Sequence, residues 1–151
     1  MLVRVTGDTL DPAQAISAVA ARDAGAIEVF LGVVRDNNLD RAVGHLVYDA
    51  YPEMAEKEMR GIAEDAVERF GLKGCAVLHR TGRLEIGETS LLVAISSAHR
   101  AEAFEAGRWV VDEIKKRVPV WKKEVWADGE AWIEGPESMG LARPPGLQAK
   151  R

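Results

Sequence analysis

Residues 91–126 read LLVAISSAHRAEAFEAGRWVVDEIKKRVPVWKKEVW, which predicts a strand, a long helix and a second strand in one run. Leu91 to Ser96 is a short apolar segment typical of a buried strand. Ser97 is placed to cap a helix from about Ala98 to Arg117, which Val118-Pro119 ends before a strand over Val120 to Trp126. The residues expected to form the buried stripe of this helix are Ala103, Phe104, Gly107, Val110, Val111 and Ile114.

The same signals continue on both sides of this stretch. The pattern predicts strands over 25–34, 45–51 and 75–79, a turn at 36–38, one helix opening at Asp11-Pro12 and another running from Pro52 to a stop at Gly71. Asp128-Gly129 is a hairpin dipeptide between the strand ending at Trp126 and a second segment over 131–134. Because strands and helices are mixed and the hairpin favours antiparallel pairing, the expected class is α+β.

The length of the chain suits one ordinary domain, and its composition is that of a globular protein. It has 151 residues, of which 47% are hydrophobic and 29% charged. We expect residues 1–135 to form a single domain and the Pro/Gly-rich segment 136–151 to be a tail that is ordered weakly or only in a complex. The N-terminus lacks a signal pattern, no apolar run approaches the ~20 residues of a membrane span, and one cysteine allows no internal disulfide. A cytoplasmic location is therefore expected.

Cations are concentrated locally on an acidic chain. The net charge is −4, which argues against a nucleic-acid partner. Basic residues nevertheless gather at 115–117 and 122–123, with His99-Arg100 and Arg35 elsewhere. Such a local basic site suggests a small anionic ligand, although a solvated charged face explains the spacing as well.

Two cationic segments lie where chemistry is plausible. Ser97 to Arg100 falls at a strand-to-helix junction, where free backbone N–H groups and the helix dipole favour an anion; an exposed first turn is the alternative. In the second segment, Lys115 has cationic and apolar neighbours, which can suit a lysine to proton transfer. Lys122 and Glu124 would share one face of a strand there. A basic helix end followed by a lysine-protected edge strand is the competing interpretation.

Other kinds of site are not expected. His45, His79 and His99 are too widely spaced for a metal motif, and we predict no metal and no cofactor. Gly-rich phosphate loops and the G-x-S-x-G nucleophile motif are absent. Cys75 lies in an apolar run and is expected to be a core residue rather than a nucleophile.

Five blocks follow one another along the chain. They are Gly25-Ala26 with Phe30-x-Gly32-x-Val34-Arg35, Tyr51-Pro52-x-Met54, His79-Arg80-x-Gly82-x-Leu84-x-x-Gly87-Glu88, Ser97-Ala98-His99-Arg100-x-x-Ala103-Phe104-Glu105-Ala106, and Lys115-x-x-x-Pro119-x-Trp121-Lys122-x-Glu124. Together they resemble the large, catalytic subunit of the molybdopterin synthase family over nearly the whole chain.

The resemblance implies a fold, a reaction and partners. The fold would be an α/β hammerhead with a mainly antiparallel sheet and a small additional β-hairpin region. The enzyme would be a sulfurtransferase of molybdenum cofactor biosynthesis, converting cyclic pyranopterin monophosphate to molybdopterin. Two sulfurs would come from the C-terminal Gly-Gly thiocarboxylate of a small ubiquitin-like subunit, which docks at each end of a homodimer to form a heterotetramer. A sulfur carried by a partner agrees with a chain whose one cysteine is core-like.

The resemblance also implies roles for particular residues. Lys115 and Lys122 would be catalytic, and Phe30 and Val111 would line the channel for the partner's tail. The substrate would contact Val33, Val34, Arg35, His99, Arg100, Lys115, Lys122, Lys123 and Glu124. Some relatives place an arginine where this chain has Gly135-Pro136, and its next arginine is Arg143, so the resemblance assigns the C-terminal segment no substrate contact.

Helix geometry adds a prediction about symmetry. Arg100 and Lys115 lie about fifteen residues apart on one helix, which corresponds to roughly 22 Å. Both can contact one small substrate only if a two-fold axis brings two copies of the chain together. Two other functions remain open: a non-enzymatic adaptor that binds a ubiquitin-like tail, and a small phosphohydrolase that uses Arg35, His99 and Arg100.

Overall fold

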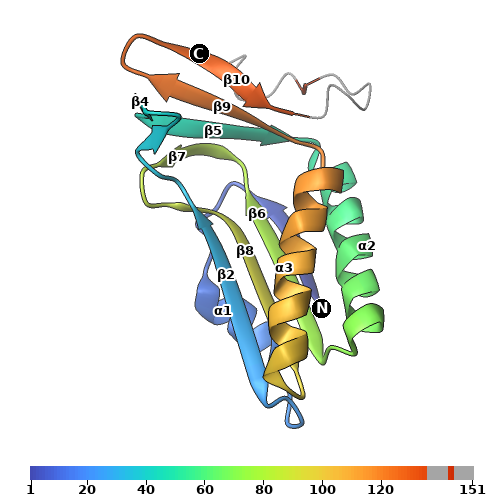
Figure 1. Cartoon of the computed structure of the whole chain (residues 1–151). Helices are drawn as coiled ribbons and strands as arrows, with labels where there is room; N and C mark the ends of the chain where they lie inside the picture. The colour runs from blue at the N-terminus through green and yellow to red at the C-terminus, as the bar shows by residue number, and fades with distance from the viewer. Residues whose placement is uncertain (136–142, 145–151) are drawn as a thin grey trace.

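The computed structural model describes residues 1–135 and 143–144 (Figure 1). Apart from residues 143 and 144, the predicted tail over 136–151 lies outside the described residues. A four-stranded sheet has the order β1 (Leu2–Thr6), β6 (Gly74–Arg80), β8 (Thr89–Ser97) and β2 (Ala26–Val33). Its β1–β6 pair is parallel and the other pairs are antiparallel. Strand β2 forms one edge of this first sheet.

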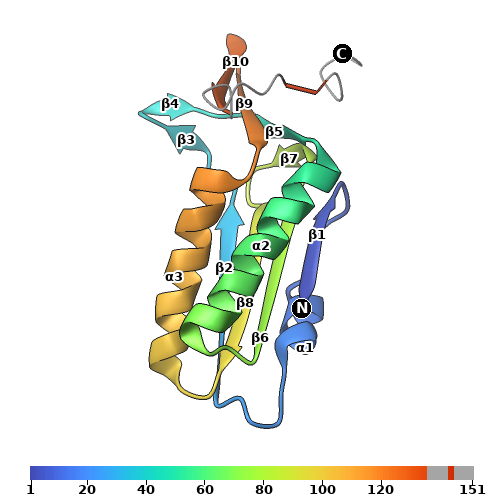
Figure 2. The same ribbon diagram turned by 90° about the vertical axis from the view of Figure 1, so that its right-hand side faces the viewer.

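Helices cover both faces of the first sheet (Figure 2). The helices α2 (Pro52–Phe70) and α3 (Arg100–Arg117) pack on one face, and α1 (Pro12–Val19) packs on the other. Alternation along the strands separates the two cores: Cys75 and Val77 of β6 belong to the α2/α3 core, whereas Ala76 and Leu78 belong to the α1 core. The described helices include none that is long and apolar enough to cross a membrane.

A second sheet lies across one end of the first sheet and its helices (Figure 1). Its antiparallel order is β10 (Gly129–Glu134), β9 (Val120–Trp126), β5 (His45–Ala50) and β7 (Gly82–Glu85). A short hairpin of β3 (Asn37–Asn38) and β4 (Arg41–Ala42) follows β2. The α+β class and the predominance of antiparallel pairing are confirmed.

Most predicted elements are present with small shifts at their ends. Helix α2 begins at Pro52 and stops at Gly71, whose φ of 63° is the left-handed conformation that glycine adopts easily. The hairpin at Asp128-Gly129 joins β9 to β10. The sequence pattern did not predict β1 or β7, which are short and complete the edges of the two sheets.

Two predictions for α3 are wrong. Ser97 does not cap it: β8 includes Ser97, the helix begins at Arg100, and His99 is the N-cap without a side-chain capping bond. Pairing holds Ser97 in the strand, because its carbonyl accepts a hydrogen bond from the Gly25 N–H. Phe104 is not buried either but is 64% exposed, because the buried side of α3 is the stripe through Ala103, Ala106, Gly107, Val110 and Ile114.

Candidate functional site

A pocket lies where the first sheet, the C-terminal end of α3 and the second sheet meet. It is lined by Phe30, Gly32, Tyr48, His79, Ser90, Leu91, Ile114, Lys115, Val118, Val120 and Lys122. These residues come from six separate elements and the α3–β9 turn. We call this cavity the lysine pocket.

The two predicted catalytic lysines meet in the lysine pocket. Lys115 comes from the last turn of α3, and Lys122 comes from β9. The helix ends at Arg117 and β9 begins at Val120, so the chain turns sharply between the two lysines. On β9, Val120 and Lys122 face the pocket while Trp121 between them is fully buried.

An adjoining cavity adds a third cation. Arg35, at the end of β2, lines it together with Lys115, Lys122 and Val33. Glu124 lines the same cavity, but both of its carboxylate oxygens are already occupied. One accepts a hydrogen bond of 2.6 Å from Asn38 Nδ2, and the other accepts one of 2.8 Å from Trp126 Nε1. Glu124 is therefore placed to anchor the β3–β4 hairpin beside the cations.

Lys123 and Val34 lie away from these cavities. Lys123 is on the opposite face of β9 from Lys122, where its 1% exposed side chain forms a 2.7 Å ion pair with Glu130. Val34 is buried in the small core behind the second sheet. Successive side chains of an extended chain point to opposite sides. Because Lys122 and Val33 line the cavities, their neighbours Lys123 and Val34 point away from them. The structure does not bring them to the predicted substrate site.

A groove between β2 and α3 adjoins the lysine pocket. It is lined by Glu28, Val29, Phe30, Phe104, Gly107, Arg108, Val111 and Asp112. The two residues predicted for the channel, Phe30 and Val111, both line this groove, and Phe30 also lines the pocket. The Glu28 carboxylate occupies the space where a side chain at Gly107 would begin, and burial raises the pKa of this carboxyl.

His99 and Arg100 are far from the lysines within one chain. They lie exposed at the start of α3, and Lys115 lies in its last turn. The rise of an α-helix makes the separation between Arg100 and Lys115 about 22 Å along the axis. The structure therefore confirms that the predicted cationic residues fall into two groups at opposite ends of α3.

Three polar pocket residues were given no role from the sequence: Tyr48, His79 and Ser90. His79 opens one of the five blocks, which was the available signal. Tyr48 and Ser90 sit in strands of different sheets, and no local pattern distinguishes them from other strand residues.

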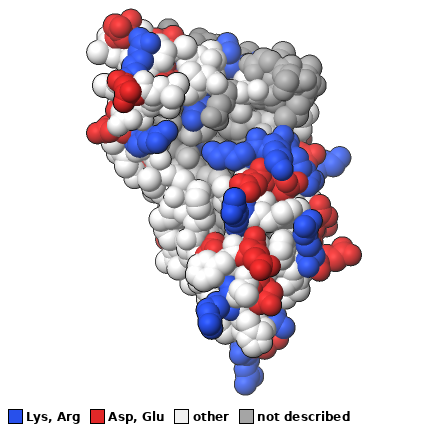
Figure 3. Space-filling model, in the orientation of Figure 1, with Lys and Arg blue, Asp and Glu red and all other residues white. Residues whose placement is uncertain are grey.

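Charged side chains are unevenly distributed over the face drawn in Figure 3. Lys and Arg side chains gather on the helix side near the second sheet, and a largely uncharged area lies over β2. Within residues 1–135 and 143–144, no three His, Cys, Asp or Glu side chains converge as metal ligands would.

The fold and the site define a class of protein: a two-sheet α+β domain in which two lysines and an arginine line adjoining cavities beside a mainly apolar groove. Such a site suits group transfer to an anionic substrate. Residues 5–117 match the family model of the MoaE protein, and the chain belongs to this family.

Similar proteins agree with the family assignment. A molybdopterin synthase catalytic subunit of Pyrococcus abyssi is 52% identical over 130 residues, which cover 86% of this chain and 88% of that protein. The crystal structure of molybdopterin synthase from Staphylococcus aureus superposes with a TM-score of 0.84 at 33% identity, covering 87% of this chain and 96% of that one. One chain of a complex of subunits 1 and 2 of molybdopterin-converting factor from Helicobacter pylori shares the fold, with a TM-score of 0.72 at 22% identity, covering 92% of this chain and 98% of that one. The family expected from the sequence is confirmed, and with it the enzyme class of molybdopterin synthase catalytic subunits.

Proposed function

We propose that this chain transfers sulfur to cyclic pyranopterin monophosphate, using the thiocarboxylated C-terminus of a small ubiquitin-like partner as donor. One observation carries the proposal: Arg35, Lys115 and Lys122 line adjoining cavities, and Phe30 lines both the lysine pocket and a groove beside it. The cavities suit the anionic substrate, and the groove suits the donor tail. The sulfur source and its acceptor would thus meet at the two lysines.

The three cations have different chemical uses. The planar guanidinium of Arg35 can bind two oxygens of a phosphate at once. An ammonium group is a compact charge, which suits Lys115 and Lys122 to neutralising the carboxylate left on the donor once its sulfur has bonded to the pterin and water has cleaved the bond between that sulfur and the donor carbonyl carbon. An amine of either lysine can also carry the proton that each sulfur transfer requires. Two rounds would produce the dithiolene of molybdopterin.

The groove suits an extended tail without bulky side chains. Phe30 and Val111 supply apolar walls, and the missing side chain at Gly107 leaves room that the Glu28 carboxylate partly fills. A carboxylate there can accept hydrogen bonds from the backbone N–H groups of a Gly-Gly tail. The complex of two subunits from Helicobacter pylori, which has this fold, supports a partner of this kind. We place the reaction in the cytoplasm, where a partner thiocarboxylate would be made and consumed.

A second copy of the chain would complete the site. Strand β2 is an edge strand whose Ile27, Leu31 and Val33 are exposed, and such an edge is a template for pairing. Two copies of β2 paired antiparallel about a two-fold axis would form one continuous sheet. This homodimer would be the centre of a heterotetramer with two donor subunits.

The dimensions of the chain agree with this pairing. Ala26 at the start of β2 is paired with Ser97, two residues before His99, whereas Val33 at the other end lines the cavity that adjoins the lysine pocket. Antiparallel pairing places the start of one β2 beside the end of the other. The eight residues of β2 span roughly 27 Å, close to the ~22 Å that separates Arg100 from Lys115 on α3. His99 and Arg100 of one copy would therefore reach the lysine pocket of the second.

The deciding experiment combines this chain with the thiocarboxylated partner and cyclic pyranopterin monophosphate, and measures dithiolene product. Product that requires all three components supports the proposal. Binding of the partner without product would instead support the adaptor function. Release of phosphate from the pterin without the partner would support the phosphohydrolase.

A further inference from the structure

His79 occupies an unusual place at the end of β6. Cys75, Val77 and His79 share the strand face that is turned toward α2 and α3. The first two pack in the apolar core, but His79 is one step beyond it and lines the lysine pocket with Lys115 and Lys122. The row of apolar side chains on this face of β6 is thus followed by an imidazole at the proposed reaction site.

The hydrogen bonding of His79 determines its tautomer. Its Nδ1 lies 2.9 Å from the carbonyl oxygen of Arg80, and a carbonyl oxygen can only accept. Nδ1 therefore carries the proton. Burial lowers the pKa of His79 to about 4; the bond to Arg80 opposes this shift, and the charge of Lys115 adds to it. At neutral pH the ring is uncharged, and Nε2 is an acceptor without a proton.

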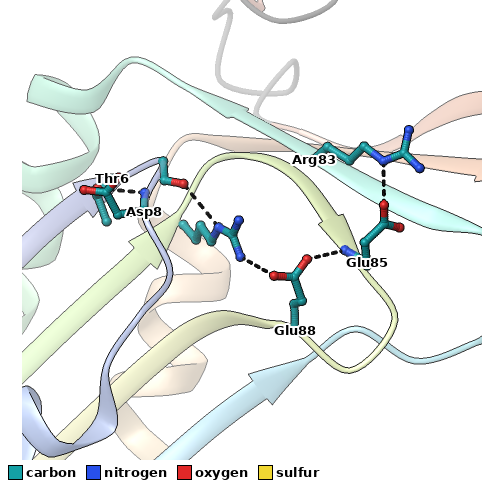
Figure 4. A network of polar contacts seen from close by, with 7 residues as sticks. Thr6, Asp8, Arg83, Glu85 and Glu88 are labelled. Carbon is teal, nitrogen blue, oxygen red and sulfur yellow. Dashed lines mark hydrogen bonds and ion pairs between the residues drawn. The ribbon is translucent and has the colours of Figure 1, made fainter.

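The ring is also held in one orientation. The Tyr48 ring packs against it edge to face, with centroids 5.2 Å apart. The backbone carbonyl of Arg80 binds the ring, and the Arg80 side chain is itself held in place. Its guanidinium forms a 2.7 Å ion pair with Glu88, which Figure 4 labels, and donates a 3.3 Å hydrogen bond to the carbonyl of Gly7. Because Nδ1 is bound to the backbone beside the ring, Nε2 on the other side of the ring is directed away from that backbone.

We propose that His79 is a positioning residue for Lys115, and that its Nε2 accepts a hydrogen bond from the Lys115 ammonium when substrate and donor tail fill the pocket. This inference rests on the proposed function. Lys115 is exposed, and its long, flexible side chain can turn toward the ring when substrate and donor tail exclude water from the pocket.

The chemistry of the surrounding groups favours a neutral acceptor at this position. Three side chains of other elements line the pocket with the ring: Lys115 from α3, whose charge acts on it, Lys122 from β9, and Tyr48 from β5, whose ring contacts it. A charged imidazole would repel both lysines, whereas an uncharged one offers a lone pair to an ammonium. Burying a polar group costs free energy unless the group is hydrogen-bonded, and a leucine would fill the same space without that cost. Accepting a hydrogen bond from a lysine would explain why a histidine stands at this position, whereas packing alone would not.

Two substitutions separate positioning from packing. His79→Asn keeps an N–H that can reach the Arg80 carbonyl but has no group at the place of Nε2, and His79→Gln can reach that place with an amide oxygen. We expect His79→Asn to fold and to bind the partner, with kcat lowered by about 10- to 100-fold, KM values little changed and the pH–rate profile displaced. His79→Gln should recover most of kcat. Wild-type kcat in a folded His79→Asn, or equal losses in both variants with an unchanged pH profile, would overturn the inference.

A measurement on the unsubstituted imidazole keeps the test decisive if the variants do not fold. Long-range ¹H–¹⁵N NMR of the chain saturated with cyclic pyranopterin monophosphate and with the partner in its carboxylate form should show an unprotonated Nε2 whose resonance moves on binding. The same movement in Lys115→Met would refute the contact, and its loss would support it. If the wild-type chain neither binds this partner nor forms dithiolene, the proposed function itself fails. If the wild type is active but the Nε2 resonance does not move, the role of His79 alone is refuted.

Discussion

Mixing two inactive variants tests whether the active site is shared between two copies of the chain. Arg100→Ala removes a cation at the start of α3, and Lys115→Ala removes one at its end, about 22 Å away. If each site combines the pocket of one copy with the helix start of the second, each variant alone has two damaged sites per dimer. Both variants should therefore be nearly inactive when assayed separately.

The expected recovery follows from counting sites. After random exchange between equal amounts of the variants, about half of the dimers are mixed. A mixed dimer has one intact composite site and one site that carries both substitutions. About one quarter of all sites, and so about one quarter of wild-type dithiolene formation, should return.

A matched control uses two variants of the same pocket. In a mixture of Lys115→Ala with Lys122→Ala, every pocket carries a substitution whatever the pairing, so no recovery is expected. Subunit exchange is followed independently by native mass spectrometry of isotopically labelled chains. If exchange is complete and the Arg100→Ala and Lys115→Ala mixture stays inactive, the shared site and the β2 pairing that would create it are wrong.

Three further outcomes are expected. Lys115→Ala should lower dithiolene formation by more than about 100-fold and Lys122→Ala by less, with partner binding retained in both; near-normal turnover by Lys115→Ala would remove its catalytic role. Cys75→Ala should retain sulfur transfer and lose about 1–2 kcal/mol of unfolding free energy, because Cys75 is fully buried and burial raises the pKa of its thiol to about 12. Loss of activity in a folded Cys75→Ala would contradict delivery of sulfur by a partner. Between pH 6.5 and 4 the unfolded chain protonates His79 and the folded chain does not. The wild type should therefore lose about 3 kcal/mol of unfolding free energy over this range, and His79→Gln should lack this loss. If the unfolding free energy, measured by urea denaturation, depends on pH equally in both proteins, this prediction is refuted.

Local patterns predicted most of the fold because the deciding signals lie close together in the chain. Pro52 and Gly71 bound α2 through the restricted φ of proline and the left-handed conformation of glycine. The wrong predictions for Ser97 and Phe104 have a nonlocal cause. Pairing with β2 extends β8 through Ser97, and the layer formed by α2 and the first sheet determines which side of α3 is buried.

The candidate site was predictable where a residue type carries a chemical meaning. Arg35, Lys115 and Lys122 were singled out as cations, and the structure places them around connected cavities. Lys123 shows the limit of this reasoning. It is next to Lys122 in the sequence, yet the alternation of β9 buries it against Glu130.

The sequence by itself determined most of the helices and strands, the family and the cations that an anionic substrate needs, because these depend on residue type, spacing and order along the chain. Only the tertiary structure decided which of those cations meet. The turn after α3 brings Lys115 to Lys122, whereas the length of α3 keeps Arg100 at the far end of the domain. It also decided that His79, Tyr48 and Ser90 line the same pocket: His79 and Ser90 lie on the paired strands β6 and β8 of the first sheet, and Tyr48 of β5 joins them only because the second sheet packs across the first. Contacts of that kind depend on how distant segments pack, which no local pattern encodes.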